Sequence, residues 1–463
     1  MEIIFDLAVI GGGPGGYTAA EKAGNAALSV VLFERRELGG VCLNEGCIPT
    51  KTLLYSAKMY DHASQGEKYG VTTEGASIDL GKVFKRKEKV VRKLVGGVKL
   101  RMKEAGVEVV KGDAVIAGRE GEVFKIVCDG KAEEPFLARN ILLCTGSETA
   151  IPPIPGLREG LESGAVVTSR EMLSSGEKPE RLVVIGGGVI GMEFVSFYNS
   201  IGTQVVVVEM LPKILGPLDD EVSQMLLTAF GKKGVEFHLG CKVTAIEGSS
   251  VVYEDGDGNV CRAEGDKVLV SVGRRPNVRG IGLESIGVAA GRGVEVDSRM
   301  RTNVPGVYAA GDVTGFSMLA HTASREAEVA VANILGRDEQ MSYDAIPSVV
   351  YTNPEVACVG MTEKEAADAA VPYRTVRLPM AYSGRFVAEN ERGEGICKMV
   401  VGDDGKVLGV HLVGNSSSEV IAAAGLAITY SMRVDDFVKT VFPHPTVAEI
   451  LKETSAAAEK TSR

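Results

Sequence analysis

A glycine-rich pattern that occurs twice in the chain constrains its fold more than any other feature of the sequence. Near the start, an apolar run leads into Gly11-x-Gly-x-x-Gly16, and in the middle a second apolar run leads into Gly186-x-Gly-x-x-Gly191. A helical pattern follows each copy, and a further apolar run then ends in an acid, Glu34 or Glu209, at the same spacing from the first glycine. The sequence therefore contains two similar strand-helix-strand units.

Each unit is typical of a dinucleotide site. The glycines permit a tight turn, close approach of the backbone to a pyrophosphate and close packing of helix on strand, with the phosphate at the helix N-terminus. The terminal carboxylate accepts hydrogen bonds from ribose hydroxyls. One such motif is weak evidence in a chain with 57 glycines, but chance does not explain two complete copies.

The rest of the chain indicates several further compact units, as expected for 463 residues. We expect a long charged helix at 81–105, short strands within 107–143, and a linker at Pro152–Pro155. A strand at 267–272 leads out of the second unit. The last part has no nucleotide pattern, and we expect strands at 347–352, 396–401 and 406–413 followed by an apolar helix at 419–431.

Composition excludes several classes of function. Apolar residues make up 45% of the chain, yet no run of about 18 uncharged apolar residues predicts a membrane span. The net charge of −10 and the lack of a basic stripe argue against nucleic acid, and the short run Lys85–Lys89 is interpreted as a solvated helix face. Because the N-terminus lacks a secretory signal, we expect a cytoplasmic protein. Eight cysteines in a chain of this length are also too few for a disulfide scaffold.

Cys42 and Cys47 form the cysteine pair that most needs an explanation. Their spacing does not match a zinc site, and no second Cys/His pair lies nearby, so no metal is predicted. In a regular helix their Cα atoms would be about 8.6 Å apart, beyond the roughly 7 Å limit for a disulfide. Gly46 and Pro49 permit a broken or starting helix there. We therefore predict an exchangeable pair, in preference to two buried thiols that never meet. Six further cysteines are interpreted as core or idle thiols: Cys128, Cys144, Cys241, Cys261, Cys358 and Cys397.

Four segments resemble one family over essentially the whole chain. The segment Gly39–Lys51 is similar to the redox-active motif of the pyridine nucleotide-disulfide oxidoreductases, the family of dihydrolipoamide dehydrogenases and glutathione reductases. Thr302–Asp312 resembles that family's second FAD motif, in which the aspartate binds the ribityl and phosphate portion. Met318–His321 resembles the neighbouring turn at the flavin, and Phe442–Glu449 the catalytic His-Pro-Thr-x-x-Glu segment.

The resemblance implies an α/β fold with two Rossmann-like dinucleotide-binding domains, for FAD and for NAD, and a C-terminal α+β dimerisation domain. The implied domains are 1–145 and 273–343 for the two parts of the FAD-binding domain, 146–272 for NAD and 344–463 for dimerisation. The implied catalytic residues are Cys42, Cys47, Lys51, Glu193, His444 and Glu449. The implied cofactor-binding residues are Gly11, Gly13, Pro14, Gly15, Gly16, Glu34, Gly40, Cys42, Lys51, Gly112, Ala114, Thr145, Gly146, Ser147, Gly186, Gly188, Val189, Ile190, Gly191, Glu209, Val243, Gly273, Gly311, Asp312, Met318, Leu319, Ala320 and His321.

In this family the histidine acts on the cysteines of the partner subunit, so the resemblance implies a homodimer with a shared site. His444 would deprotonate a substrate thiol, Cys42 would exchange with it, and Cys47 would face the flavin, with Lys51 near the flavin N5 and paired with Glu193. The implied partner is a lipoyl-carrying domain of a 2-oxoacid dehydrogenase complex or of the glycine cleavage system.

Substrate choice within the family depends on a few positions. Glu209 favours NAD because a carboxylate repels the 2′-phosphate of NADP, and Val189 stands where glutathione reductases commonly have tyrosine. Both favour oxidation of dihydrolipoamide to lipoamide. Thr50 and Phe442 depart from the usual serine and histidine, and Phe442 bears on how the substrate entrance is lined. The alternatives are an NADPH-dependent reductase of glutathione or another small disulfide, and an FAD-containing scaffold without activity.

Overall fold

The computed structural model describes residues 3–129, 134–390 and 393–460. Its first sheet has the strand order β3-β2-β1-β6-β5-β4, and β17 also pairs with β6. Strands β3, β2, β1, β6 and β17 are parallel, whereas β4 and β5 are antiparallel to their neighbours. The strands are β1 (Ile4–Ile10), β2 (Val30–Glu34), β3 (Glu108–Lys111), β4 (Ala114–Glu120), β5 (Val123–Cys128), β6 (Phe136–Leu143) and β17 (Val307–Ala309).

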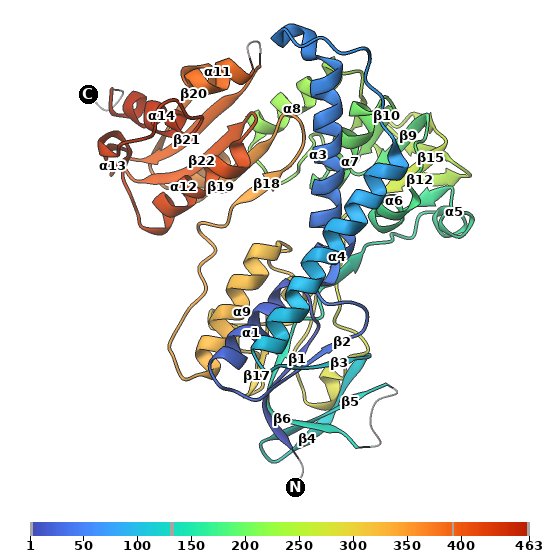
Figure 1. The fold of residues 1–463 in the computed structure, drawn as a ribbon, viewed down its shortest axis with the longest axis vertical. Coiled ribbons are helices and arrows are strands. Elements are labelled where there is room, and N and C mark those ends of the chain that lie inside the picture. Colours follow the sequence, from blue (N-terminus) through green and yellow to red (C-terminus); the bar gives the residue numbers. More distant parts are fainter. Residues whose placement is uncertain (1–2, 130–133, 391–392, 461–463) are drawn as a thin grey trace.

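The central strand β1 is buried on both faces, as expected of a parallel strand covered on two sides. Leu7 and Val9 pack into the cluster that contains the helices, and Ala8 and Ile10 into the cluster on the opposite face. The helices of this part are α1 (Pro14–Asn25), α2 (Gly40–Glu45), α3 (Cys47–Ser64), α4 (Leu80–Glu104) and α9 (Ala320–Ile334). The helix predicted at 81–105 is thus found as α4, the long helix that crosses the molecule in Figure 1.

The second unit repeats this plan. Its sheet is wholly parallel, with the strand order β11-β10-β9-β15-β8. The strands are β8 (Val166–Val167), β9 (Arg181–Ile185), β10 (Gln204–Glu209), β11 (Glu236–Leu239) and β15 (Lys267–Val270). The antiparallel strands β12 (Lys242–Glu247), β13 (Ser250–Glu254) and β14 (Val260–Glu264) form a small sheet, and β7 (Ser147–Thr149) pairs with β16 (Arg274–Pro276) where the chain enters and leaves. The helices are α5 (Leu157–Ser163), α6 (Ser169–Ser175), α7 (Val189–Ser200) and α8 (Asp220–Lys232).

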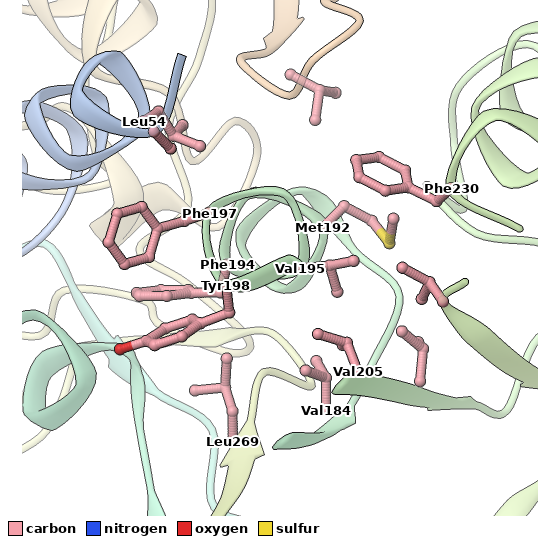
Figure 2. Packing of buried hydrophobic residues seen from close by; sticks show 14 of the residues in the cluster. Leu54, Val184, Met192, Phe194, Val195, Phe197, Tyr198, Val205, Phe230 and Leu269 are labelled. Carbon is pink, nitrogen blue, oxygen red and sulfur yellow. The ribbon is translucent and has the colours of Figure 1, made fainter. Parts of the chain in front are cut away.

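Helix α7 is surrounded by protein on nearly every side. Figure 2 shows Phe197 pointing toward Leu54 of α3, and Met192 pointing toward Phe230 of α8. A helix that is apolar all round must be buried to be stable in water. Because α3 packs on α7, the helix that follows Cys47 is joined to the second nucleotide unit (Figure 1).

The C-terminal part is an antiparallel sheet covered by helices, at the side of the molecule coloured orange and red in Figure 1. Its strand order is β18-β19-β22-β21-β20. The strands are β18 (Ser348–Val350), β19 (Val356–Gly360), β20 (Tyr373–Pro379), β21 (Ile396–Gly402) and β22 (Val407–Val413), and the helices are α10 (Glu363–Asp368), α11 (Gly384–Glu389), α12 (Ser417–Thr429), α13 (Val434–Lys439) and α14 (Glu449–Lys460). The predicted fold class is confirmed; β19 and β20 were not predicted.

Candidate functional site

The first glycine turn leaves an open cradle at the N-terminus of α1. Gly11 has φ +106°, and a Cβ there would lie 2.2 Å from the Cys144 carbonyl oxygen. A Cβ on Gly16 would lie 1.8 Å from the carbonyl oxygen of Gly11. At Gly13, by contrast, the nearest atom to an added Cβ is Gly40 Cα at 3.9 Å, and no side chain caps the helix. The first N–H groups of α1 are therefore free to bind a phosphate.

The second glycine turn has the same geometry. Gly186 has φ +103°, and a Cβ there would lie 2.3 Å from the Ser271 carbonyl oxygen. Gly191 again packs on the carbonyl of the first glycine, at 2.3 Å from an added Cβ. A Cβ on Gly188 would meet no atom within 4 Å, and no side chain caps α7. Both turns therefore fit a dinucleotide pyrophosphate.

The two acids are held in equivalent positions. Glu34 accepts from the Gly12 N–H at 2.8 Å, and Glu209 accepts from the Gly187 N–H at 2.6 Å. In each case the second carboxylate oxygen accepts from the backbone two residues later. Each carboxylate thus lies beside its glycine turn, where a ribose would follow the pyrophosphate.

In the segment that follows Glu209, which the structure describes throughout, no side chain up to Lys213 offers a free cation for a 2′-phosphate. Met210 and Leu211 are exposed and apolar. The nearest lysine in sequence, Lys213, donates to the Leu218 carbonyl at 2.8 Å and pairs with Asp220. This environment suits the two hydroxyls of an NAD ribose better than the phosphate of NADP.

Beside the first cradle, Asp312 lies in a polar cluster. Ser147 donates to its Oδ2 at 2.5 Å, and Arg274 Nε is 3.8 Å from the same oxygen. Arg274 also donates to the Ser147 hydroxyl and carbonyl, both at 2.7 Å. Burial lowers the pKa of Arg274, against the opposing effect of Asp312. Asp312 and Ser147 are predicted from the sequence as cofactor-binding residues, but Arg274 is not.

A buried carboxyl, Glu326 on α9, supports the Gly311–Asp312 turn from beneath. Its side chain accepts from the Gly311 N–H at 2.6 Å and from the Tyr343 hydroxyl at 2.7 Å. Burial raises the pKa of Glu326 to about 7, although both hydrogen bonds oppose the shift. The sequence had not singled out Glu326 or Tyr343, because neither belongs to a motif.

The other predicted cofactor residues are spread over both nucleotide units and the segments that join them. Gly40 lies against Gly13, and the Gly112 N–H donates to the Glu34 carbonyl at 3.1 Å. Thr145 donates to the Asn277 carbonyl at 2.7 Å, and His321 Nε2 is 2.8 Å from the Pro347 carbonyl oxygen. Burial lowers the pKa of His321. The remaining positions are Pro14, Gly15, Val189 and Ile190 in the first turns of α1 and α7, Ala114 on β4, Gly146 beside β7, Val243 on β12, Gly273 beside β16, and Met318, Leu319 and Ala320 at the start of α9.

The two cysteines lie on either side of a break in a helix. Helix α2 ends at Glu45, Gly46 has φ −149° and ψ −106°, and α3 begins at Cys47. The predicted interruption of the helix is confirmed. Both side chains are free thiols in the structure, and the two sulfurs lie close enough to interact.

This contact divides the roles of the two sulfurs. The hydrogen bond from Cys42 lowers the pKa of Cys47 to about 7, with help from the Lys51 ammonium and against burial. The same bond, together with burial, raises the pKa of Cys42. Of the two thiols, Cys47 is therefore the one that loses its proton first.

Lys51 and Glu193 form the predicted ion pair, joining α3 to α7. The Lys51 ammonium is 2.9 Å from both carboxylate oxygens, and the Glu193 side chain is only 4% exposed. Burial alone would lower the pKa of Lys51, but the Glu193 carboxylate raises it above its ordinary value. The positive charge thus stays beside Cys47.

His444 and Glu449 form a second pair in the C-terminal part. Glu449 lies 3.0 Å from His444 Nδ1 and also accepts from the Thr446 N–H at 2.8 Å. The His444 side chain is 77% exposed, and within the described ranges no hydrogen bond or ion pair joins it to either cysteine. Phe442 packs against Phe437, with ring centroids 6.3 Å apart. An oriented, exposed imidazole is free to act on a neighbouring subunit.

Two dinucleotide cradles and a pair of neighbouring thiols at a helix break define a pyridine nucleotide-dependent thiol oxidoreductase. The family model described as pyridine nucleotide-disulphide oxidoreductase matches residues 5–327, and the model of that family's dimerisation domain matches residues 346–455. The chain therefore belongs to the pyridine nucleotide-disulphide oxidoreductase family.

Curated relatives and solved structures agree with this assignment. The chain is 39% identical to the dihydrolipoyl dehydrogenase of Chlorobaculum parvum, over 98% of this chain and 97% of the relative. It is 38% identical to the dihydrolipoyl dehydrogenase of Geobacillus stearothermophilus, over 97% and 95%. LpdA from Mycobacterium tuberculosis has a TM-score of 0.89 at 25% identity, covering 98% of this chain and 99% of the other. The predicted enzyme class and the predicted cofactors, FAD and NAD, are confirmed by these relationships.

Two further observations concern other kinds of site. Within the described ranges, no helix is long and apolar enough to cross a membrane. In the same residues, no group of three or more His, Cys, Asp and Glu side chains is arranged to hold a metal ion.

Proposed function

We propose that this chain is an NAD-dependent dihydrolipoyl dehydrogenase, which oxidises protein-bound dihydrolipoamide through Cys42 and Cys47. The observation that carries the proposal is the pair of neighbouring thiols at the helix break, beside the Lys51–Glu193 ion pair. Contact with Cys42 and the Lys51 charge lower the pKa of Cys47 to about 7. A thiol with a pKa close to the working pH is an effective leaving group and is reactive in exchange. The relatives named dihydrolipoyl dehydrogenase support the choice of substrate.

The thiol steps can be written for the chain's own residues, starting from the disulfide form. His444 takes the proton of one substrate thiol, and the resulting thiolate attacks the sulfur of Cys42. The bond between the two cysteines breaks, and Cys47 leaves as a thiolate beside Lys51. The second substrate thiol then attacks the substrate sulfur bound to Cys42, and Cys42 leaves and takes up the proton that this thiol loses. The cyclic substrate disulfide leaves, and its two electrons remain in the reduced cysteine pair.

The cofactors would occupy the two cradles. Gly13 and the N-terminus of α1 would hold the FAD pyrophosphate, with Glu34 on the ribose and Asp312 toward the ribityl chain. Gly188 and Glu209 would hold NAD in the same way. FAD, when bound, supplies the two-electron chemistry between the thiol pair and NAD. Lys51, paired with Glu193, would keep a positive charge on the flavin side of Cys47.

The proposed active site needs two subunits. The exposed His444–Glu449 pair is in the part of the chain matched by the dimerisation model, whereas Cys42 and Cys47 are in the other part. We propose that His444 serves the cysteines of the partner subunit, and that the dimer takes its substrate from a lipoyl-carrying protein of a 2-oxoacid dehydrogenase complex or the glycine cleavage system. We also propose a cytoplasmic location, in keeping with the sparse cysteines.

Steady-state assays of the purified protein test the proposal. NAD with dihydrolipoamide, NADH with lipoamide, and NADPH with lipoamide or glutathione disulfide would be compared at equal enzyme concentration. We expect turnover with lipoamide and NADH, and less than about a tenth of that rate with NADPH, because bringing the 2′-phosphate against the Glu209 carboxylate places like charges together, which costs several kcal/mol. A preference for NADPH and glutathione disulfide would replace the proposal with the reductase alternative.

A further inference from the structure

Tyr351 contacts both members of the Lys51–Glu193 pair, although it belongs to the C-terminal part of the chain. The Tyr351 N–H donates to Glu193 Oε1 at 3.1 Å. Its ring lies under the Lys51 ammonium, 4.6 Å from Nζ to the ring centroid. This distance is within the range of a cation–π interaction, which strengthens as the cation loses water. Tyr351 therefore contacts Glu193 through its backbone and Lys51 through its ring.

The segment that carries Tyr351 is itself held in place by several hydrogen bonds. The Asn353 N–H donates to the Ser196 hydroxyl at 3.1 Å, and its side-chain amide donates to Asp61 at 3.2 Å. The Asn353 carbonyl accepts from Lys233 at 2.6 Å. Helices α3 and α7 and the residue that follows α8 thus all bind the residue two positions after Tyr351, so the backbone that carries the ring is held beside Lys51.

The position of Lys51 matters to Cys47, one helical turn earlier on α3. The Lys51 charge lowers the pKa of Cys47, and Glu193 opposes this effect. A Lys51 ammonium that turned toward solvent would favour the thiolate less, because the attraction between charges falls with distance and with access of water. The titratable and charged groups that face Cys47 are Cys42 from α2, Lys51 from α3, Glu193 from α7, Arg274 from β16 and Tyr17 from α1.

We propose that Tyr351 is a positioning residue, which holds Lys51 beside Cys47 through its aromatic ring and steadies Glu193 through its backbone. Through it, the C-terminal part of each subunit acts on the cysteine pair of that same subunit, in addition to providing His444 for the partner. The inference rests on the proposed roles of Cys47 and Lys51 in dihydrolipoamide oxidation.

Alkylation of the reduced holoenzyme by iodoacetamide tests the proposal without relying on turnover. The rate of modification of Cys47 is followed against pH, with the site assigned by peptide mass spectrometry and Cys261 on β14 as an internal reference thiol. In Tyr351→Leu and Tyr351→Met, which keep the backbone N–H but lack the ring, we expect the midpoint for Cys47 to rise by about half a pH unit or more. Tyr351→Phe keeps the ring and should have the midpoint of the unaltered protein. FAD content and circular dichroism establish that each variant is folded.

The outcomes separate this inference from the proposed function. Unchanged Cys47 midpoints in folded Leu and Met variants would overturn the positioning role, as would a Phe variant that behaves like Leu. We also expect kcat with dihydrolipoamide to fall about threefold to tenfold in Leu and Met, and by less than about twofold in Phe, in line with a cation–π contact of this kind. If the unaltered protein did not oxidise dihydrolipoamide but the Cys47 shift were present, the positioning role would stand and the proposed function would fail.

Discussion

The two glycine-rich units have the same turn geometry but very different surroundings. In both motifs the first glycine has a left-handed backbone, and the last glycine packs on the carbonyl of the first. The carboxylate of the acid accepts a hydrogen bond from the backbone N–H that directly follows the first glycine. Helix α1 nevertheless buries small residues against α9, whereas α7 buries Phe194, Phe197 and Tyr198 (Figure 2). The two sites thus share their backbone geometry. They differ in the helix that packs on each motif helix, α9 on α1 and α3 on α7.

One equivalent position shows what this difference does. Seven residues after the first glycine, α1 has Thr18 and α7 has Glu193. Thr18 donates to the Ser324 hydroxyl on α9 at 3.3 Å, a neutral contact between two helices. Glu193 pairs with Lys51 on α3, next to Cys47. Through Glu193, helix α7 therefore couples the second unit electrostatically to the cysteine pair. The equivalent residue of the first unit, Thr18, is uncharged and provides no such coupling.

The largest expected effect on lipoamide turnover comes from removing the sulfur of Cys47, the group that the charges of Lys51 and Glu193 act on. For Cys47→Ser we expect lipoamide turnover to fall on the order of 10⁴-fold, because no sulfur remains to complete exchange. FAD content should remain that of the unaltered protein, since both glycine turns are intact. Full lipoamide activity in this variant would refute the proposed relay; Cys128→Ser, a buried cysteine outside the site, is the matched control.

Removing His444, the proposed base, tests whether the two nucleotide sites work independently of the thiol chemistry. For His444→Gln we expect lipoamide turnover to fall about 10² to 10⁴-fold, the usual contribution of a general base. Oxidation of NADH by an artificial dye should persist, because that reaction needs only the two cofactor sites. Circular dichroism should be unchanged for so exposed a side chain, and a parallel loss of structure would contradict the assignment.

A crossed pair of glycine substitutions compares the two cradles directly. Gly13→Ala and Gly188→Ala place a methyl group where the protein leaves open space, so the folded chain tolerates both. We expect Gly13→Ala to lower FAD content, and Gly188→Ala to raise the KM for NADH about tenfold while FAD stays bound, as for the loss of a charge-assisted hydrogen bond. Gly231→Ala in α8, also in open space, is the control. Loss of FAD from Gly188→Ala would show that the two sites are not independent.

The smallest expected effect on turnover concerns the buried carboxyl beneath the first unit, whose titration acts on stability instead. The pKa of Glu326 is about 7 in the folded protein against 4.5 for an ordinary glutamate, so the folded chain keeps a proton that the unfolded chain has released. The contribution of Glu326 to the free energy of unfolding is fully present below pH 4.5. It falls as the pH rises to about 7, by roughly 3 kcal/mol in total.

Glu326→Gln removes this titration and should flatten the fall in unfolding temperature between about pH 5 and 7. Thermal unfolding monitored by circular dichroism across this range measures the effect, with the partly exposed Glu328→Gln on the same helix as the control. Equal slopes for Glu326→Gln and the unaltered protein would mean that Glu326 is ionised throughout.

Local patterns were enough to predict the elements with strong periodicity. Both glycine turns and helix α4 are where the sequence places them, and the helix break at Gly46 follows from the spacing of the cysteines. Strands β19 and β20 were missed because their apolar runs are short and not bounded by a recognised motif. Arg274, Glu326 and Tyr351 were missed for a different reason: each acts through contacts with residues far away in the sequence.

The sequence by itself determined the two dinucleotide units, their acids and the exchangeable cysteine pair, because turns, helix starts and spacing limits are properties of a few consecutive residues. Only the tertiary structure decided which thiol has the lowered pKa, how deeply the Glu193 carboxylate that pairs with Lys51 is buried, and that a tyrosine from the C-terminal part contacts that pair. These features depend on burial and on distances of a few ångströms between segments far apart in the chain. Electrostatic effects of this kind depend on separation and access of water, and neither is written in the local order of residues.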